Sequence, residues 1–388
     1  MTTSKLTGLI AAPFTALHPD GSLNLEQIKP QADHLATTGV GGAFVCGTTG
    51  EGLSFTTSER ERVAERWVKA AAKRLKVIVH VGHNSLEESR HLAAHAARAG
   101  ADAVATHGPT FVRPASVREL VEFCAGVAAA APELPFYFYH IPVMTGVHLP
   151  MPEFLTLGAR RIPNLAGIKF TDENLMSFSQ CLQLEGGRFN LLFGRDEILL
   201  AALALGATGA VGSTYNYIAP VYHRLWDAFA RGDLAAARRH QWTALQIIAV
   251  MIRHGGLPAG KAMMGFIGLE CGPVRPPLRT LTEGEVAALR RELESVGFAG
   301  PFAGTSGDAL LVGGGANFPE AMPWDGGRKV WHDRVFVLTN PADTWRTGFE
   351  LPRPLAYGVS VSTPEGVLCA GGSDAQEHHR EVFLLRWA

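Results

Sequence analysis

Short apolar runs alternate with longer segments of helical period over the first 230 residues of this chain. The runs are rich in β-branched and aromatic residues, whereas the longer segments repeat apolar residues every three or four positions, so the pattern predicts strands and helices in turn. The predicted strands are residues 6–13, 42–47, 76–82, 102–107, 135–142, 165–171, 190–194 and 209–214. The predicted helices include residues 24–37, 57–74, 86–99, 117–130, 175–184, 197–205 and 220–231.

Eight such alternations are typical of a TIM (β/α)8 barrel, an α/β fold whose parallel strands are buried on both faces and therefore read as continuous apolar runs. A doubly wound open sheet is the competing architecture. It usually has fewer repeats and a Gly-x-Gly-x-x-Gly turn after its first strand, and no such turn follows residue 13. We therefore expect a barrel over residues 1–230.

Helical patterns resume at residues 234–254, 257–268 and 282–295, and Arg275-Pro-Pro-Leu278 breaks the chain before the last of them. We expect three added helices over residues 231–300. They would form a C-terminal extension of the barrel, packed on it or carrying an oligomer contact.

The composition changes at Gly300-Pro301, and we place a domain boundary there. Four of the seven tryptophans lie beyond it, no segment of helical period follows, and Gly-Gly pairs close apolar runs at residues 310–314 and 367–372. This all-β pattern has the spacing of propeller blades. We predict that residues 301–388 are a partial kelch-like propeller segment of about two blades, since one blade takes about 50 residues.

The charge of the chain is balanced, with 35 basic and 36 acidic side chains. No global field therefore attracts nucleic acid or an anionic membrane, and we expect small molecules or other proteins as partners. The first residues lead directly into the predicted strand at 6–13 without a signal-peptide pattern, and no run of about eighteen apolar residues follows. We expect a cytoplasmic protein.

The cysteines are scattered along the chain without metal-binding or Cys-x-x-Cys spacing. An odd number of widely separated cysteines favours reduced thiols over a disulfide framework. The five are Cys46, Cys124, Cys181, Cys271 and Cys369.

One lysine interrupts an apolar strand. Lys169 lies in Leu165-Ala-Gly-Ile-Lys-Phe-Thr171, where a buried strand would carry valine or isoleucine. Burial disfavours the ammonium form and lowers a lysine pKa, so the free amine can attack a carbonyl carbon near neutral pH, as Schiff-base catalysis requires. The alternative is an edge-strand lysine whose stem packs on apolar surface and whose head reaches water. This run alone leaves both interpretations open.

Polar side chains gather at the predicted strand ends, which converge on one face of such a barrel. The second strand ends in Gly47-Thr-Thr-Gly-Glu51, where the hydroxyls of Thr48 and Thr49 and exposed backbone N–H groups can hold a carboxylate. The fifth strand carries Tyr137 and Tyr139 on one side of the sheet. A buried tyrosine is commonly a packing residue, but beside a Schiff-base lysine Tyr139, which is nearer the strand end, can shuttle protons.

The seventh and eighth strands add further candidates. Asp196 and Glu197 follow the seventh strand at a helix start, where acidic side chains also favour the helix dipole, and Ser213 follows the eighth strand. The two carboxylates and the hydroxyl can form hydrogen bonds with sugar hydroxyls. The histidines of the chain show no metal-ligand spacing, so we expect no metal site.

Five motifs together are too specific for coincidence. They are Gly47-Thr-Thr-Gly-Glu51, Tyr139-His-Ile-Pro142, Gly167-Ile-Lys-Phe-Thr171, Gly194-Arg-Asp-Glu197 and Gly209-Ala-Val-Gly-Ser-Thr214. In order and spacing they resemble the N-acetylneuraminate lyase and dihydrodipicolinate synthase family of pyruvate-dependent class I aldolases. The resemblance covers about residues 5–298, within which the chain looks most like the sialic acid lyases of the vertebrate type.

The resemblance implies a role for each candidate residue. Lys169 would form an imine with C2 of the keto acid and Tyr139 would relay the proton of the C4 hydroxyl, with no cofactor beyond this covalent imine. Thr48 and Thr49 would bind the substrate carboxylate. The rest of the sugar chain would be bound by Thr171, Gly194, Asp196, Glu197 and Ser213. The implied reaction is the cleavage of N-acetylneuraminate, a keto acid sugar, to N-acetylmannosamine and pyruvate by a homotetramer.

Two positions depart from the family pattern. Met144 stands where dihydrodipicolinate synthases carry an arginine for the second carboxylate of their substrate, and a neutral side chain fits a neutral acyl-amino sugar better. Phe111 stands where the family often places a tyrosine that a neighbouring subunit adds to the proton relay. A hydroxyl from elsewhere in the protein, or the substrate itself, would then complete the relay.

The tail resembles kelch-type N-acetylneuraminate mutarotase through residues 303–319, 331–338 and 355–361. Closed propellers need about four or more blades, so we expect about two blades to carry no mutarotase activity by themselves. Two other functions stay open for the whole chain. One is another aldolase of the family, acting on a 2-keto-3-deoxy acid or on aspartate semialdehyde. The other is a non-catalytic scaffold whose kelch segment binds proteins.

Overall fold

The computed structural model describes residues 5–294, 301–317, 328–340 and 345–387. The chain divides into two compact units, residues 1–283 and 284–388, which are described in turn. The boundary predicted near residue 300 lies outside the described residues. No helix among the described residues has the length and apolar character needed to cross a membrane.

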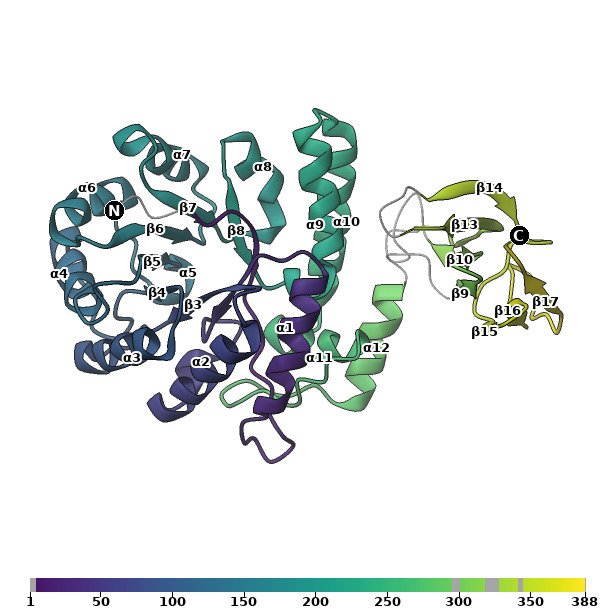
Figure 1. Ribbon diagram of the computed structural model, residues 1–388, viewed down its shortest axis with the longest axis horizontal. Helices are drawn as coiled ribbons and strands as arrows, with labels where there is room; N and C mark the ends of the chain where they lie inside the picture. Colours follow the sequence, from purple (N-terminus) through teal and green to yellow (C-terminus); the bar gives the residue numbers. More distant parts are fainter. Residues whose placement is uncertain (1–4, 295–300, 318–327, 341–344, 388) are drawn as a thin grey trace. The chain divides into compact units, whose positions relative to one another are not determined.

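The first unit is built on eight parallel strands that close into a barrel in chain order, from β1 to β8 (Figure 1). The strands are β1 (Gly8–Ala11), β2 (Gly42–Val45), β3 (Lys76–His80), β4 (Ala103–Thr106), β5 (Phe136–His140), β6 (Leu165–Phe170), β7 (Asn190–Phe193) and β8 (Gly209–Gly212). Each lies inside a predicted strand, so the predicted TIM barrel is confirmed. The competing open sheet is wrong, because β8 pairs with β1 and the sheet has no edge.

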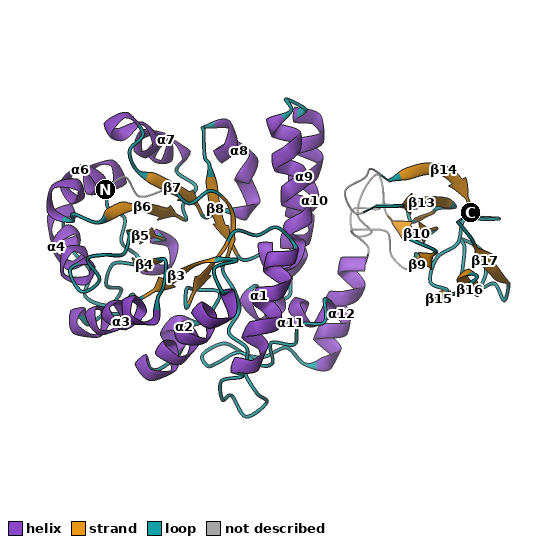
Figure 2. Cartoon of the chain, viewed as in Figure 1, coloured by secondary structure: helices purple, strands orange, loops and turns teal. Residues whose placement is uncertain are grey.

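Helices follow the strands and surround the barrel (Figure 2). They are α1 (Ile28–Thr37), α2 (Thr57–Ala71), α3 (Leu86–Ala99), α4 (Val117–Ala128), α5 (Pro142–Thr145), α6 (Met151–Arg161), α7 (Leu175–Gln183), α8 (Leu199–Ala204) and α9 (Tyr215–Ala230). Single turns of 3-10 helix are η1 (Leu25–Gln27), η2 (Gly52–Ser54), η3 (Leu184–Gly186) and η4 (Asp196–Ile198).

Three of these helices differ from the prediction. The sequence pattern did not predict α5 or α6, each of which has a proline in its first turn, where the missing N–H costs no helical hydrogen bond. Helix α9 begins at Tyr215 and not at residue 220, because Pro220 lies inside it, two residues after a kink at Ile218 with φ −127° and ψ 27°. A proline normally marks the first turn of a helix, and the kink gives Pro220 that local position.

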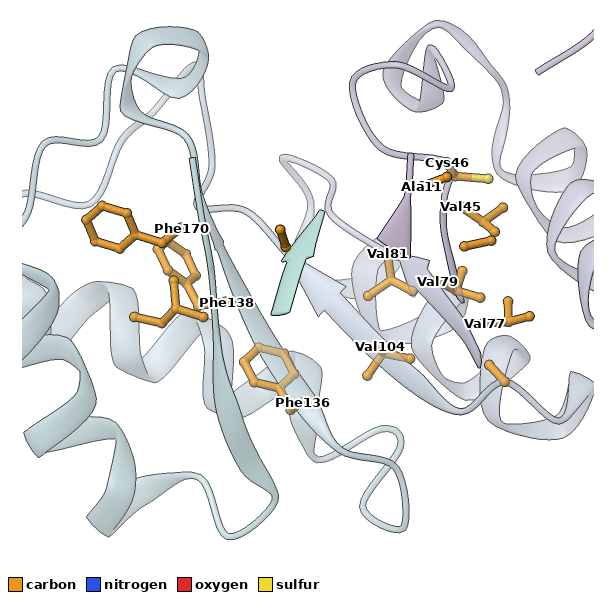
Figure 3. Packing of buried hydrophobic residues seen from close by; sticks show 14 of the residues in the cluster. Ala11, Val45, Cys46, Val77, Val79, Val81, Val104, Phe136, Phe138 and Phe170 are labelled. Atoms are coloured by element: carbon orange, nitrogen blue, oxygen red, sulfur yellow. The ribbon is translucent and has the colours of Figure 1, made fainter. Parts of the chain in front are cut away.

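The core of this unit has one layer inside the barrel and one between the barrel and its helices. Successive side chains along a strand point to opposite faces. The inner layer includes Ile10, Phe44, Ile78, Tyr137, Tyr139, Leu192 and Val211. The outer layer includes Val45, Val77, Val79, Val104, Phe136, Phe138 and Phe170 (Figure 3). Because both faces of each strand are buried, the strands read as continuous apolar runs.

The three added helices are present where the pattern predicted them. They are α10 (Leu234–Arg253), α11 (Leu257–Phe266) and α12 (Glu283–Glu294), the last of which begins at the boundary between the two units. Asp233 begins α10 by accepting a hydrogen bond from the backbone N–H of Ala236. This cap satisfies one of the N–H groups that a first helical turn leaves unpaired.

The second unit contains antiparallel strands, as the all-β pattern predicted. A four-stranded sheet has the order β14-β13-β10-β9, a three-stranded sheet has the order β15-β16-β17, and β11 pairs with β12. The strands are β9 (Phe302–Ser306), β10 (Ala309–Gly313), β11 (Ala316–Asn317), β12 (Val330–Trp331), β13 (Arg334–Leu338), β14 (Arg346–Glu350), β15 (Val359–Thr363), β16 (Gly366–Ala370) and β17 (Val382–Leu385).

Candidate active site

The predicted site residues meet at the carboxyl ends of the barrel strands, where they line one cavity of about 160 Å³. Parallel strands in one closed ring all end on the same face, so the loops after β2, β5, β6, β7 and β8 converge there. The nine residues are Thr48, Thr49, Tyr139, Lys169, Thr171, Gly194, Asp196, Glu197 and Ser213.

Lys169 is buried in the barrel interior, with 4% of its surface exposed. Its strand, β6, is paired with β5 on one side and β7 on the other, so the edge-strand interpretation is wrong. The amine nitrogen Nζ lies 3.9 Å from the centre of the Phe44 ring and 4.1 Å from the centre of the Tyr139 ring. Tyr139 is also the register partner of Lys169 on β5.

Burial lowers the pKa of Lys169 to about 7. The buried carboxyl of Asp196 acts in the opposite direction, because a nearby negative charge favours the ammonium form. A large fraction of the amine is therefore uncharged at neutral pH, and the uncharged amine is the form that adds to a carbonyl carbon.

The phenol of Tyr139 lies at the end of β5, with its oxygen 3.2 Å from Oγ1 of Thr48. Burial raises the pKa of Tyr139 to about 12, against the smaller opposing effect of the hydrogen bond with Thr48. Tyr139 is thus a neutral phenol at neutral pH, which can donate one proton while it accepts another. Tyr137 points to the same side of the sheet but donates its hydrogen bond to Oδ1 of Asn190, at 2.8 Å.

A buried ion pair that the sequence analysis missed holds the turn that carries Thr48 and Thr49. Glu51 has a left-handed backbone, with φ 54°. Its Oε1 lies 2.7 Å from Nζ of Lys261 on α11, and its Oε2 accepts a hydrogen bond from the backbone N–H of Arg275, also at 2.7 Å. The only signal in the sequence was a lone lysine in the apolar helix 257–266, and nothing local links it to a carboxylate 210 residues away.

Asp196 does not cap a helix, although it follows β7 at a helix start. Its Oδ2 accepts hydrogen bonds from the backbone N–H and the hydroxyl of Thr214, at 2.9 and 2.6 Å, and so joins the end of β7 to the end of β8. Its Oδ1 has no hydrogen-bond partner among the described residues. Burial, with repulsion from Glu197, raises the pKa of Asp196 to about 6.

The remaining polar groups lie around the cavity on the same strand ends. Glu197 is 3.7 Å from the guanidinium of Arg195, which also pairs with Glu173 at 3.0 Å. Gly194 has no room for a side chain, because a Cβ there would lie 2.0 Å from Oγ1 of Thr171. The hydroxyl of Thr171 is buried and makes no hydrogen bond within the described structure. These groups can receive a ligand with several hydroxyls.

Two apolar residues of α10, Ile248 and Met251, complete the lining of this cavity. The sequence analysis missed them. The apolar period of the segment predicted the helix, but it does not say which of its apolar residues reach the barrel opening.

A second cavity, of about 510 Å³, lies beside the first and shares Thr48 and Tyr139 with it. It is lined also by Met144 and by His80 and His107, whose rings stack with their centres 5.0 Å apart. Burial lowers the pKa of both histidines, which keeps the imidazoles neutral at neutral pH. The sequence analysis missed this histidine pair, because the two residues belong to different strand ends.

Phe111 lies on the surface of the unit, with 89% of its side chain exposed. Within the described ranges, no group of three or more histidine, cysteine or carboxylate side chains has an arrangement that could hold a metal ion. All five cysteines are buried and free.

Two family models match the chain. The model of the dihydrodipicolinate synthetase family matches residues 5–296, and the model of N-acetylneuraminate epimerase matches residues 282–388. The first match covers the barrel and its added helices, and the second covers the strands of the second unit.

Curated relatives are similar to the barrel region. An N-acetylneuraminate lyase of Rattus norvegicus is 44% identical over 299 residues, which are 76% of this chain and 93% of the relative. An N-acetylneuraminate lyase of Gallus gallus is 44% identical over 297 residues, which are 75% of this chain and 96% of the relative.

Solved structures are similar to the same region of the chain. Proteus mirabilis N-acetylneuraminate lyase superimposes with a TM-score of 0.74 and 43% identity, covering 76% of this chain and 99% of that one. A dihydrodipicolinate synthase from Bacteroides thetaiotaomicron superimposes with a TM-score of 0.70 and 29% identity, covering 74% of this chain and 98% of that one. The chain therefore belongs to the dihydrodipicolinate synthetase family.

Proposed function

We propose that this chain is a class I aldolase that cleaves N-acetylneuraminate to N-acetylmannosamine and pyruvate through an imine on Lys169. The observation that carries the proposal is the buried amine of Lys169 beside the ring of Tyr139, at the carboxyl ends of the barrel strands. Similarity to N-acetylneuraminate lyases from Rattus norvegicus and Proteus mirabilis supports this choice of substrate.

The first step of the proposed reaction is formation of the imine. The free amine of Lys169 adds to C2 of the open-chain keto acid, and water is lost. The protonated imine carries a positive charge, which the nearby carboxyl of Asp196 stabilises when it is ionised. This charge makes the imine an acceptor for the electron pair of a neighbouring bond.

The second step is cleavage of the bond between C3 and C4. Its electron pair moves into the imine to form an enamine, while the C4 hydroxyl loses its proton and becomes the aldehyde of the acyl-amino sugar. Because Tyr139 is a neutral phenol, it accepts this proton only as it passes its own proton on. We propose that the acceptor is the substrate carboxylate. Protonation of the enamine and hydrolysis then release pyruvate and free the amine.

The other lining residues are proposed to bind and orient the substrate. Thr48 and Thr49 would donate hydrogen bonds to its carboxylate, which brings that group close to the phenol of Tyr139. Contacts to the hydroxylated chain are proposed for Thr171, Gly194, Asp196, Glu197 and Ser213. Oγ1 of Thr171 and Oδ1 of Asp196 have no hydrogen-bond partner among the described residues, which supports this assignment, since buried polar atoms normally have partners.

Dihydrodipicolinate synthesis is the second candidate, because an enzyme of that name superimposes on the barrel at 29% identity. Its aldehyde substrate brings a second carboxylate, which a cation normally binds. The neutral side chain of Met144 lines the second cavity, and the nearby guanidinium of Arg195 is already paired with Glu173 and Glu197. This supports a neutral sugar as the leaving aldehyde.

Trapping with borohydride tests the central proposal. Incubation of the full chain with pyruvate and borohydride is expected to add one reduced pyruvyl group, which peptide mapping locates on Lys169. The variant Lys169→Met should gain nothing. The control Lys76→Met, which removes an exposed lysine at the other end of the barrel, should be labelled like the wild type. An unlabelled wild type would overturn the imine mechanism.

Substrate turnover then separates the two aldolase candidates. N-acetylneuraminate, a 2-keto-3-deoxy acid, and aspartate semialdehyde with pyruvate are offered to the same preparation. Cleavage of N-acetylneuraminate is expected to be fastest by at least about tenfold, a difference of about 1.4 kcal/mol in activation free energy. Faster consumption of aspartate semialdehyde would replace the proposed substrate while leaving the imine in place.

We propose further that the second unit is a kelch-type partial propeller related to N-acetylneuraminate epimerase. Its two larger sheets are fewer than the four or so blades of a closed propeller. Residues 301–388 of a single chain should therefore not interconvert the sialic acid anomers. Anomer exchange followed by NMR tests this: residues 301–388 alone should not speed it, and a folded, active mutarotase made from those residues would overturn the proposal.

The assembly and compartment of the protein are also proposals. The apolar loop that carries exposed Phe111 and Val112 supports a subunit contact in a homotetramer. The five free buried thiols support the reducing environment of the cytoplasm. Light scattering of the full chain tests the first proposal, with Phe111→Ser expected to give smaller species.

A further inference from the structure

Arg195 is a charged residue of the first cavity to which the proposed reaction assigns no role. It follows β7 and lines the cavity of about 160 Å³ together with the predicted site residues. Among the described residues that line this cavity, Lys169 and Arg195 are the basic ones. Because Lys169 is covalently bound to the substrate in the proposed imine, Arg195 is the cation of that lining which remains for a noncovalent contact.

Two carboxylates on neighbouring strand ends hold the guanidinium of Arg195. Nη2 lies 3.0 Å from Oε1 of Glu173, which follows β6, and Nη1 lies 3.7 Å from Oε1 of Glu197, which follows β7. The second distance is too long for a hydrogen bond. Nε is buried and has no hydrogen-bond partner within the described ranges. Arg195 is therefore held in place but keeps N–H donors that its two carboxylate partners do not use.

The guanidinium of Arg195 also lies within electrostatic reach of the Tyr139 phenol. Burial is the main cause that raises the pKa of Tyr139, and the positive charge of Arg195 is among the smaller effects that lower this pKa. In the proposed reaction the phenol takes the proton of the C4 hydroxyl. Arg195 is therefore close to C4 of a bound substrate and to the substituent on the next carbon, C5.

The substituent on C5 of N-acetylneuraminate is an acyl-amino group, which forms hydrogen bonds in a different way from a hydroxyl. A hydroxyl donates and accepts, whereas the acyl carbonyl oxygen only accepts. The ionised carboxylates of Asp196 and Glu197 also only accept, so they can bind hydroxyls but not this carbonyl. A guanidinium only donates, and its hydrogen bonds are stronger than those of a neutral hydroxyl such as that of Ser213.

The charge around Arg195 favours the same kind of ligand. Two glutamates already surround the guanidinium, and one of them, Glu197, lines the cavity itself. A further anion would be repelled by these carboxylates. A neutral acceptor such as an amide carbonyl is not repelled in this way.

We propose that Arg195 donates a hydrogen bond to the acyl carbonyl oxygen of the substrate and so selects acyl-amino sugars over sugars with a hydroxyl at C5. This assignment rests on the proposed lyase function, in which the imine on Lys169 fixes the position of C2. Arg195 thus determines specificity and takes no part in breaking the bond between C3 and C4. Glu173 and Glu197 position the guanidinium, because they hold it between the loops after β6 and β7.

Turnover of two matched substrates tests the proposal on the full chain. One is N-acetylneuraminate, and the other is its analogue with a hydroxyl at C5 in place of the acyl-amino group. Arg195→Met is expected to lower kcat/KM for N-acetylneuraminate at least about tenfold, the usual effect of losing a hydrogen bond to a charged group. It should change kcat/KM for the analogue far less. The control Arg188→Met removes an exposed arginine at the other end of β7, paired with Glu185, and should change neither value.

A second variant separates the hydrogen bond from the charge. Arg195→Lys keeps a positive charge between the two glutamates but loses the planar set of N–H donors. It is expected to lose the preference for the acyl-amino substrate, as Arg195→Met does. Full preference in Arg195→Lys would show that charge alone is sufficient and would overturn the proposal. Equal losses on both substrates in Arg195→Met would also overturn it, since Arg195 would then act only by holding Glu197.

Borohydride trapping of pyruvate separates this proposal from the proposed function. Pyruvate has no C5, so both Arg195 variants should be labelled on Lys169 like the wild type, which also shows that their barrels are folded. A labelled wild type that does not prefer the acyl-amino substrate would refute the role of Arg195 and leave the imine intact. An unlabelled wild type would refute the lyase function and this role with it.

Discussion

The barrel and the second unit both contain strands that read as continuous apolar runs, yet they bury those runs in different ways. In the barrel, each strand is paired on both sides, its inner face packs in the barrel interior, and its outer face packs on helices of the same chain. In the second unit, each of the two larger sheets buries one face, and the outward side of β15, β16 and β17 keeps apolar side chains exposed in the described structure.

The difference shows that closure of the sheet, and not the apolar composition of its strands, creates a buried site where the pKa of a side chain is shifted. The closed barrel buries the side chain of Lys169, which is why its pKa falls to about 7. The open sheets of the second unit leave apolar side chains of β15, β16 and β17 exposed to water.

Removing the buried amine is expected to have the largest effect on activity and stability. Only the barrel should be affected. Lys169→Met is expected to reduce lyase activity to background, because no imine can form. It should also stabilise the barrel at neutral pH. The lysine pKa is about 7 in the folded barrel and 10.5 ordinarily, so the unfolded chain binds the proton more tightly. The native lysine therefore costs stability fully below pH 7 and progressively less up to about pH 10.5.

Thermal melting of the barrel at several pH values checks this predicted pH dependence of stability. The gain from Lys169→Met should be a few kcal/mol at pH 6 and should vanish near pH 11. A gain that does not change with pH would show that it comes from packing and not from the charge. The melting of the second unit serves as an internal reference and should not move.

Removing the phenol oxygen should give the next largest effect, on rate and not on stability. Tyr139→Phe is expected to lower kcat by a factor of about 10²–10⁴, which is the usual rate contribution of a positioned general acid or base. The hydrogen bond between its phenol and Thr48 is worth only about 1 kcal/mol of stability. Tyr137→Phe is the matched control, since it removes a buried hydroxyl two residues earlier on the same strand. Equal losses of kcat in the two variants would argue against the assigned role.

Breaking the ion pair behind the Thr48-Thr49 turn should destabilise only the barrel. Glu51→Gln leaves the ammonium of Lys261 buried without its partner, which typically costs about 3–5 kcal/mol. Calorimetry should show the barrel transition at lower temperature and the second transition unchanged. The double variant Glu51→Gln with Lys261→Met should recover much of the loss, because the unpaired charge is gone. A double variant as unstable as the single one would assign the effect to the turn geometry.

The smallest effects are expected from substitutions of two adjacent residues on β16. One side chain lies on the buried face of the sheet and the other on its exposed face. Val367→Ala removes buried methyl groups and should lower the stability of the second unit by about 1–2 kcal/mol. Leu368→Ala, on the exposed side, should change the stability of the second unit by less than about 0.5 kcal/mol. Neither should alter lyase turnover. A large loss from Leu368→Ala in dilute solution would mean that its face is covered within a single chain.

Local pattern alone predicted much of this protein. The eight strands, most of the helices between them and the three added helices follow from hydrophobic period, because that period reflects which faces are buried. Lys169 was recognisable since a charged residue is out of place in a buried strand, and the polar residues at the strand ends followed from the fold. Pro220 misled the prediction, because a kink allows a proline inside a helix.

Only the tertiary structure decided how distant residues meet. It paired Glu51 with Lys261, joined Asp196 to Thr214, brought α10 to the cavity and turned the valines of β15 outward. The physical reason is the range of the interactions. A residue's preference for helix, strand or burial is set by its own side chain and its near neighbours, whereas its hydrogen-bond partner and its pKa depend on groups that folding brings from elsewhere in the chain.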